Sequence, residues 1–149
     1  DEQYKFLGPS IYERKTDGFD FVKGNMPVVY ISLGTVIKGA VSFFQSCVDA
    51  FRGENMDVII SVGQKFNVDK LKGIPSNVHI YKSVPQLDVL KIADVFVTHG
   101  GMNSVSEALV YGTPMVVIPL VSDQPVNARC IEKIGAGKNT TYVDVKRLQ

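Results

Sequence analysis

The sequence predicts a single α/β domain built on a doubly wound, Rossmann-like parallel sheet. The chain has 149 residues, of which 45% are hydrophobic, and at that length one domain buries roughly 70% of its unfolded surface. Its short β-rich runs are almost uniformly apolar, which is typical of parallel strands covered on both faces. Segments of helical periodicity separate these runs, and right-handed alternation of strand and helix produces a doubly wound sheet.

Five short apolar runs are the predicted strands. They are VVYIS (28–32), DVIIS (57–61), VHIY (78–81), DVFVT (94–98) and MVVI (115–118). In such a sheet, ligands bind at the carboxyl ends of the strands, in the loops that lead into helices. The loops that follow these five strands are therefore the places to look for function.

The first predicted helix follows the first strand. Val41, Phe44, Val48 and Phe51 recur on one helical face, and Gly53 is a natural C-terminal stop.

Three more helices are expected after the third, fourth and fifth strands. Pro85 suits the first position of a short helix. Gly112 closes the next helix, and the last is expected over residues 125–134 and ends at Gly135.

The two ends of the chain indicate a longer protein. Residues 1–24 are more polar and irregular, and we interpret them as an interdomain linker with an edge segment. Residues 25–149 then form the main domain, which we expect to be cut at its C-terminal end. The chain starts at Asp1 without a methionine, and residues 145–149 resemble the start of another helix.

Composition argues against several classes of protein. The net charge is +1 with no basic cluster, so nucleic acid is not the expected partner. No apolar run approaches the ~20 residues of a membrane span, and we expect no signal peptide before the domain. Cys47 and Cys130 lie in predicted helices without CxxC spacing, so we expect buried free thiols and a cytoplasmic location.

The loop HGGMNS (99–104) has the composition of an anion site. Gly100 and Gly101 allow the backbone to approach a ligand closely, and the following helix presents free N–H groups and its positive dipole end. Asn103, Ser104 and His99 add donors, so a diphosphate would fit. The simpler interpretation is a tight turn in which Asn103 or Ser104 caps the helix.

Two other polar groups have competing interpretations. Ser104 and Glu107 match the S-x-x-E capping box, whereas the rival hypothesis has Glu107 accepting hydrogen bonds from ribose. Asp123 or Ser122 can cap the helix that begins near Pro125. Alternatively, Asp123 and its neighbouring glutamine bind sugar hydroxyls.

Several familiar motifs are missing. The sequence has no Asp-x-Asp, His/Cys cluster or HExxH, so it offers no evident metal site. It also lacks a P-loop and the G-x-G-x-x-G of nicotinamide and flavin sites. Neither of the two histidines is obviously paired with a nucleophile, which argues against a self-contained hydrolase. His79 is expected to be a packed or edge residue.

Residues 83–128, SVPQLDVLKIADVFVTHGGMNSVSEALVYGTPMVVIPLVSDQPVNA, closely resemble the donor-binding signature of the UDP-glycosyltransferases. Within that family the run is most similar to bacterial macrolide-type enzymes, and residues 6–10 and 30–36 also resemble it. The resemblance implies the C-terminal, nucleotide-sugar half of a two-domain GT-B enzyme. It implies inverting, metal-independent transfer of a hexose from a UDP-sugar, expected to be UDP-glucose, to a small-molecule acceptor without a cofactor.

The resemblance also implies a role for each matching residue. The expected contacts are Thr35 with the diphosphate, Val84 (backbone) and Gln86 with the nucleoside, His99, Asn103, Ser104 and the Met102 backbone with the phosphates, Glu107 with ribose, and Asp123 and Gln124 with the transferred sugar.

One departure from the family pattern concerns the base. Ser83 stands where an aromatic residue often stacks on uracil, so stacking is weaker or comes from elsewhere, for which Phe66 is a candidate. Met102 replaces the tryptophan of plant members, which fits a bacterial origin.

In this family the general base is a histidine of the N-terminal domain, which also binds the acceptor. We therefore expect this chain alone to bind the donor without turnover, with His99 stabilising the leaving group in its protonated form. Two alternatives remain open. One is a non-catalytic nucleotide-sugar-binding subunit that works with a separate acceptor chain, and the other is a UDP-sugar epimerase, which would need acid and base carboxylates in its cleft.

Overall fold

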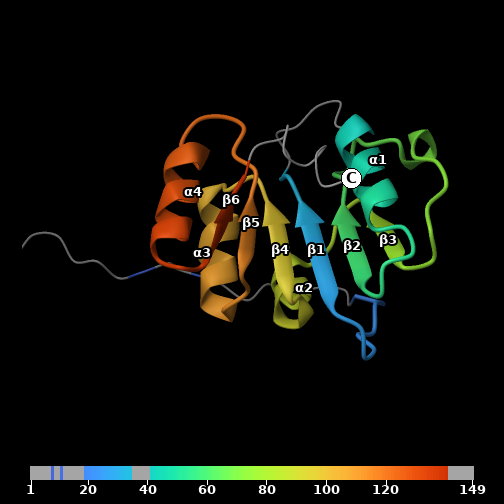
Figure 1. Cartoon of the computed structure of the whole chain (residues 1–149), viewed down its shortest axis with the longest axis horizontal. Coiled ribbons are helices and arrows are strands. Elements are labelled where there is room, and N and C mark those ends of the chain that lie inside the picture. The colour runs from blue at the N-terminus through green and yellow to red at the C-terminus, as the bar shows by residue number, and fades with distance from the viewer. Residues whose placement is uncertain (1–7, 9–10, 12–18, 35–40, 141–149) are drawn as a thin grey trace, which may run out of the picture.

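The computed structural model describes residues 8, 11, 19–34 and 41–140. Within them the chain forms one sheet of six strands in the order β3-β2-β1-β4-β5-β6, and every pairing is parallel (Figure 1). The predicted doubly wound α/β fold is therefore confirmed.

The elements follow the predicted alternation closely. Their bounds are β1 Val28–Ser32, α1 Val41–Ala50, β2 Asp57–Ser61, the short 3-10 helix η1 Val68–Lys70, β3 Val78–Tyr81, α2 Gln86–Ile92, β4 Val95–Thr98, α3 Met102–Tyr111, β5 Met115–Val117, α4 Gln124–Lys133 and β6 Gly137–Asn139. Strand β6 and helix η1 were not predicted. Strand β4 starts one residue later, and β5 ends one residue earlier, than their apolar runs suggest.

The strand order reverses at β1, which lies in the middle of the sheet. The chain runs from β1 outward through β2 to β3, then returns to place β4 on the other side of β1. Ile31 accordingly pairs with Ile60 on one side and with Val97 on the other. The loops that leave β1 and β4 therefore diverge at the topological switch point, where open α/β sheets bind ligands.

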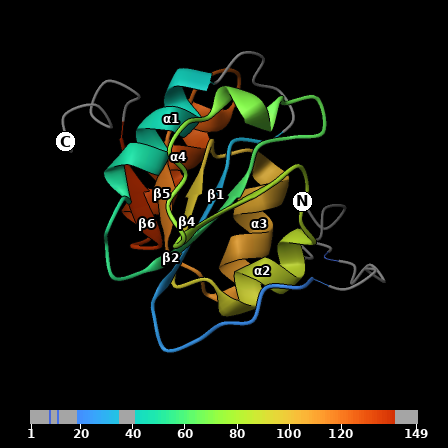
Figure 2. The ribbon, with the colours of Figure 1, turned by 90° about the vertical axis from the view of Figure 1, so that its right-hand side faces the viewer.

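Alternate side chains of β1 are buried on opposite faces of the sheet. Val29 and Ile31 pack in a cluster with the apolar face of α1. Val28 and Tyr30 pack in a second cluster with α2 and α3. Figure 2 shows α1 on one side of the sheet and α2 and α3 on the other. This two-sided burial explains why the strands are apolar throughout.

Strand β6 is the edge strand next to β5, and helix α4 packs against it. A Cβ at Gly137 would collide with the Met115 carbonyl group and lie 3.0 Å from Ile131 Cγ2 of α4. Glycine is thus required by close packing, and the sequence Gly-Lys-Asn carries no apolar signal for a strand.

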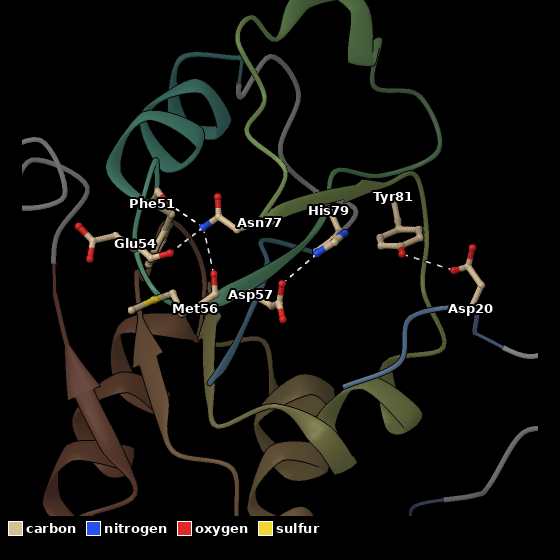
Figure 3. Close-up of polar contacts among 8 residues, drawn as sticks. All are labelled: Asp20, Phe51, Glu54, Met56, Asp57, Asn77, His79 and Tyr81. Atoms are coloured by element: carbon tan, nitrogen blue, oxygen red, sulfur yellow. Dashed lines mark hydrogen bonds and ion pairs between the residues drawn. The ribbon is translucent and has the colours of Figure 1, made fainter. Parts of the chain in front are cut away.

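The segment before β1 packs along the β3 side of the domain. Phe21 meets the His79 ring edge-on at 5.0 Å, and His79 Nε2 lies 3.2 Å from Asp57 Oδ1 (Figure 3). The Tyr81 hydroxyl donates to Asp20 at 3.4 Å. The expectation that His79 is a packed edge residue is confirmed, because β3 ends the sheet.

Asn77, at the amino end of β3, forms hydrogen bonds with the turn that follows α1. Its Nδ2 donates to the carbonyl groups of Phe51, Glu54 and Met56 (Figure 3). These hydrogen bonds lie at the end of the sheet opposite the carboxyl ends of the strands.

Two expectations about composition can also be compared with the structure. Cys47 is buried as expected, but Cys130 is exposed on α4, so the prediction that both thiols are buried was wrong for Cys130. Among the described residues, no helix is long and apolar enough to cross a bilayer. Most of the 1–24 segment (residues 1–7, 9–10 and 12–18) and residues 141–149 lie outside the described residues.

Candidate functional site

His99 lies at the switch point, wedged between two glycines from different loops. A Cβ at Gly34, after β1, would approach His99 Cε1 to 2.7 Å, and a Cβ at Gly101 would approach Nε2 to 2.6 Å. Either contact is shorter than real Cβ atoms tolerate. The glycines therefore let the loops of β1 and β4 close around the imidazole ring.

The His99 ring is buried but incompletely satisfied. Its Nδ1 is the buried side-chain nitrogen that has no hydrogen-bond partner among the described residues. Burial lowers the pKa of His99 below its ordinary value, and the negative charge of Asp123 partly opposes this effect. The free protein thus holds a neutral imidazole near neutral pH. A buried polar atom without a partner is unusual, and a ligand would supply one.

Helix α3 begins earlier than the capping interpretations require. Its N-cap is Gly101, with no side-chain cap bond, so Asn103 and Ser104 lie inside the first turn and cap nothing. The interpretation that either of them is the N-cap was wrong. The first intrahelical bond runs from the Val105 N–H to the Gly101 carbonyl, and the N–H groups before it are free for an anion. Met102 and Asn103 are exposed at this opening.

Glu107 contacts α2 instead of closing a capping box. Gln86, the first residue of α2, donates from Nε2 to Glu107 Oε2 at 2.5 Å and to Ser104 Oγ at 3.2 Å. The buried Tyr30 hydroxyl donates to Gln86 Oε1 at 3.1 Å. The capping-box interpretation was wrong, because Ser104 is not the N-cap. The structure instead brings Gln86, Ser104 and Glu107 together.

Asp123 and Gln124 lie at the start of α4. Asp123 is the N-cap residue but makes no side-chain cap bond, so the capping interpretation is right for its position and wrong for its contact. Gln124 is buried, and its Oε1 accepts from the N–H groups of Leu120 and Val121 at 2.9 and 3.0 Å. Both of these side-chain hydrogen bonds use Oε1, which leaves the amide N–H groups of Gln124 for a ligand.

Asn127 belongs to this site although sequence reasoning missed it. Its Nδ2 donates to the Gly100 carbonyl at 2.9 Å and to Asp123 Oδ2 at 3.0 Å. The available signal was its position four residues after Asp123, which places both side chains on one face of a helix.

The remaining residues predicted for the site make no described hydrogen bonds with the groups around His99 or Glu107. Val84 is half-buried against the α2 and α3 cluster, and Ser83 is exposed. Phe66 packs edge-on to Phe44, with ring centroids 5.2 Å apart, so its ring is used in the core beneath α1. Thr35 lies outside the described residues.

No group of three potential metal ligands occurs among the described residues. The described part of the site consists of neutral donors, a helix N-terminus and carboxylates around one buried imidazole.

Comparison with known proteins identifies the family of the chain. Residues 13–147 match the sequence model of the family described as UDP-glucoronosyl and UDP-glucosyl transferase. The chain is 44% identical over 140 residues to the UDP-glucosyltransferase YojK of Bacillus subtilis, covering 92% of this chain and 34% of that protein. It is 32% identical over 140 residues to the oleandomycin glycosyltransferase of Streptomyces antibioticus, covering 93% of this chain and 33% of that protein.

A solved structure agrees with the sequence relatives. The glycosyltransferase of kitacinnamycin superimposes with a TM-score of 0.85 and 35% identity, over 95% of this chain and 37% of that one. The chain thus spans about a third of the length of the curated relatives it matches.

Proposed function

The chain belongs to the UDP-glucuronosyl and UDP-glucosyl transferase family, and from that premise we propose that it binds the sugar donor for an inverting, metal-independent enzyme. That enzyme would transfer a hexose from a UDP-sugar to a small-molecule acceptor. The fold is that of the C-terminal half of GT-B glycosyltransferases, and the macrolide-type enzymes are among its relatives.

The observation that carries the proposal is the buried His99 at the N-terminus of α3. Its Nδ1 has no partner among the described residues, and the free N–H groups of Met102, Asn103 and Ser104 begin the helix beside it. A diphosphate would accept hydrogen bonds from both sources and meet the positive end of the helix dipole. Thr35, after β1, would add a hydroxyl to the same phosphates.

The network around Gln86 would bind the nucleoside. Tyr30 donates to the Gln86 carbonyl oxygen, which directs the Gln86 amide nitrogen toward Glu107. One carboxylate oxygen of Glu107 is thereby engaged, and the other would accept from ribose hydroxyls. Gln86 and the backbone of Val84 would address the base. Because Ser83 is exposed and small, aromatic stacking on uracil is not expected from that position.

The first turn of α4 would bind the hexose. Asp123 offers a carboxylate oxygen to sugar hydroxyls, and Gln124, held through its Oε1, offers its amide N–H groups. UDP-glucose is the expected donor.

The chemistry of this arrangement is stabilisation of a leaving group. When an acceptor hydroxyl attacks the anomeric carbon from the face opposite the leaving group, the bond to the diphosphate breaks and the configuration inverts. Negative charge then grows on the diphosphate, and donors already aimed at it lower the barrier. The same charge would raise the pKa of His99 and favour its protonated form. His99 is thus a leaving-group stabiliser, and not the base.

The remaining requirements fall outside this chain. The general base and the acceptor site would belong to an N-terminal domain, so this chain alone would bind the donor without turnover. No cofactor is needed for this chemistry. The cytoplasmic location and the absence of a nucleic-acid partner stay predictions.

Thermal unfolding with UDP and UDP-glucose tests the proposal. Ligand at ~100 times its dissociation constant should add about 2.7 kcal/mol to the free energy of unfolding. TDP and GDP measured beside UDP would identify the base. A folded sample whose melting temperature does not change at millimolar UDP and UDP-glucose would contradict the proposal.

A further inference from the structure

Asn127 joins two parts of the site that come from separate loops. It is a buried residue of α4, with 7% of its surface exposed. One amide nitrogen, Nδ2, donates both to the Gly100 carbonyl group and to Asp123 Oδ2. Gly100 follows His99 in the loop after β4, whereas Asp123 begins α4. The side chain therefore bridges the diphosphate loop and the sugar-binding carboxylate.

The loop around Gly100 has little freedom to move relative to α4. Gly100 has a φ of +85°, and a Cβ there would lie 2.7 Å from Val117 Cγ1 and 3.5 Å from the Gln124 carbonyl oxygen. The loop thus packs directly on the first turn of α4. The hydrogen bond from Asn127 Nδ2 to Asp123 Oδ2 then sets the orientation of the Asp123 side chain, and the bond to the Gly100 carbonyl ties that orientation to the loop.

Asparagine suits this position for a chemical reason. Both of its partners are acceptors, a carbonyl oxygen and a carboxylate, and the amide NH₂ group supplies two donors. Because one carboxylate oxygen is engaged, the other is presented to the ligand in a set direction. An exposed aspartate without such a partner would sample several rotamers, and binding would then cost the entropy of ordering it.

We propose that Asn127 is a positioning residue that holds the Asp123 carboxylate in register with the Gly100 loop, so that sugar and diphosphate are recognised together. The inference rests on the proposed function. It predicts that Asn127 contributes more to the binding of UDP-glucose than to that of UDP, since UDP lacks the sugar that Asp123 would contact.

The test compares two dissociation constants in one variant. Isothermal titration calorimetry of UDP and of UDP-glucose gives the ratio of their affinities for the wild-type chain and for Asn127→Ala. The preference for UDP-glucose relative to UDP should fall roughly five- to tenfold in the variant. This is less than the loss of a whole charge-assisted hydrogen bond, because the Asp123 carboxylate stays present but is no longer held in place. Should Asn127→Ala fail to fold, Asn127→Ser is measured in the same way. Its hydroxyl is too short to reach both acceptors, and the same loss is expected.

Asn77→Ala is the matched control. Asn77 is also an asparagine whose Nδ2 donates to backbone carbonyl groups (Figure 3). It precedes β3, at the amino ends of the strands, whereas Asn127 lies in the first turn of α4, at the carboxyl ends. The Asn77→Ala substitution should lower the melting temperature and leave the ratio of UDP-glucose to UDP affinity unchanged. An Asn127 variant that loses stability but keeps the wild-type ratio would overturn the inference while leaving the proposed function intact. A folded wild-type chain that binds neither ligand would overturn both.

Discussion

Replacement of Glu107 by alanine separates a structural role from a ligand-binding role at one residue. In the free protein the Glu107 carboxylate accepts one hydrogen bond, from Gln86 Nε2. The Gln86 amide also donates to Ser104 Oγ at 3.2 Å, so it keeps a partner when the carboxylate is removed. The loss of stability should therefore stay near that of one ordinary hydrogen bond, about 1 kcal/mol of unfolding free energy.

The expected loss of affinity is larger. Hydrogen bonds between ribose hydroxyls and a carboxylate contribute about 1.5–3 kcal/mol, which corresponds to a roughly 10- to 150-fold weaker dissociation constant for UDP. Titration calorimetry with UDP and chemical denaturation measure the two quantities on the same samples. Glu132→Ala, an exposed glutamate near the end of α4, is the control and should change neither.

A Glu107→Ala variant that loses stability but binds UDP as tightly as the wild-type chain would refute this reasoning. The contact with Gln86 would then be the whole role of Glu107.

Four other predictions concern the loop around His99. His99→Gln should weaken UDP-glucose binding at least tenfold, since a neutral amide replaces the imidazole that would become positively charged beside the diphosphate, whereas His79→Gln, at the edge of the sheet, should leave binding unchanged in the same titration. Burial depresses the pKa of His99 in the free protein, and a bound diphosphate would raise it. UDP-glucose affinity should therefore increase as pH falls from the pKa of the bound state towards the lower pKa of the free state. His99→Gln should flatten this pH profile. In the free protein the same depression makes the unfolded chain bind more protons, so denaturation should show that stability declines as pH falls below about 6.5, the ordinary pKa of histidine. Gly100→Ala should lower the unfolding free energy by about 1–3 kcal/mol, because its φ is +85° and Val117 Cγ1 blocks the new methyl group.

The sequence predicted the sheet well because the strands are buried on both faces. Val28 to Ser32 are all buried, and a run of this kind has few other uses in a domain of this size. Strand β6 has no such signal, since Gly137 and Lys138 form a strand only through pairing with β5. Its presence depends on tertiary contact and not on local pattern.

For the candidate site, the sequence names residues but does not predict the contacts that they make in the fold. The S-x-x-E spacing of Ser104 and Glu107 fits a capping box, but α3 begins at Met102, so local spacing misjudged the start of the helix. The true partner of Glu107 is Gln86, 21 residues away in sequence. No local motif encodes such a contact.

Besides these contacts, the sequence could not predict that the His99 ring is buried. Glycines beside His99 indicate an anion site, but they do not reveal that the ring is enclosed by Gly34 and Gly101 or that enclosure lowers its pKa. The role of Asn127 is likewise invisible in the sequence, because the Gly100 carbonyl and the Asp123 carboxylate come together around its side chain only in the folded chain.

Direct titration of UDP-glucose into the folded chain tests the central claim, which is that the loops at the β1–β4 switch point bind a nucleotide sugar. We predict saturable binding with one site per chain, weakened by His99→Gln and unaffected by His79→Gln. Absence of binding at millimolar UDP-glucose in a folded sample, or binding that His99→Gln leaves unchanged, would contradict it.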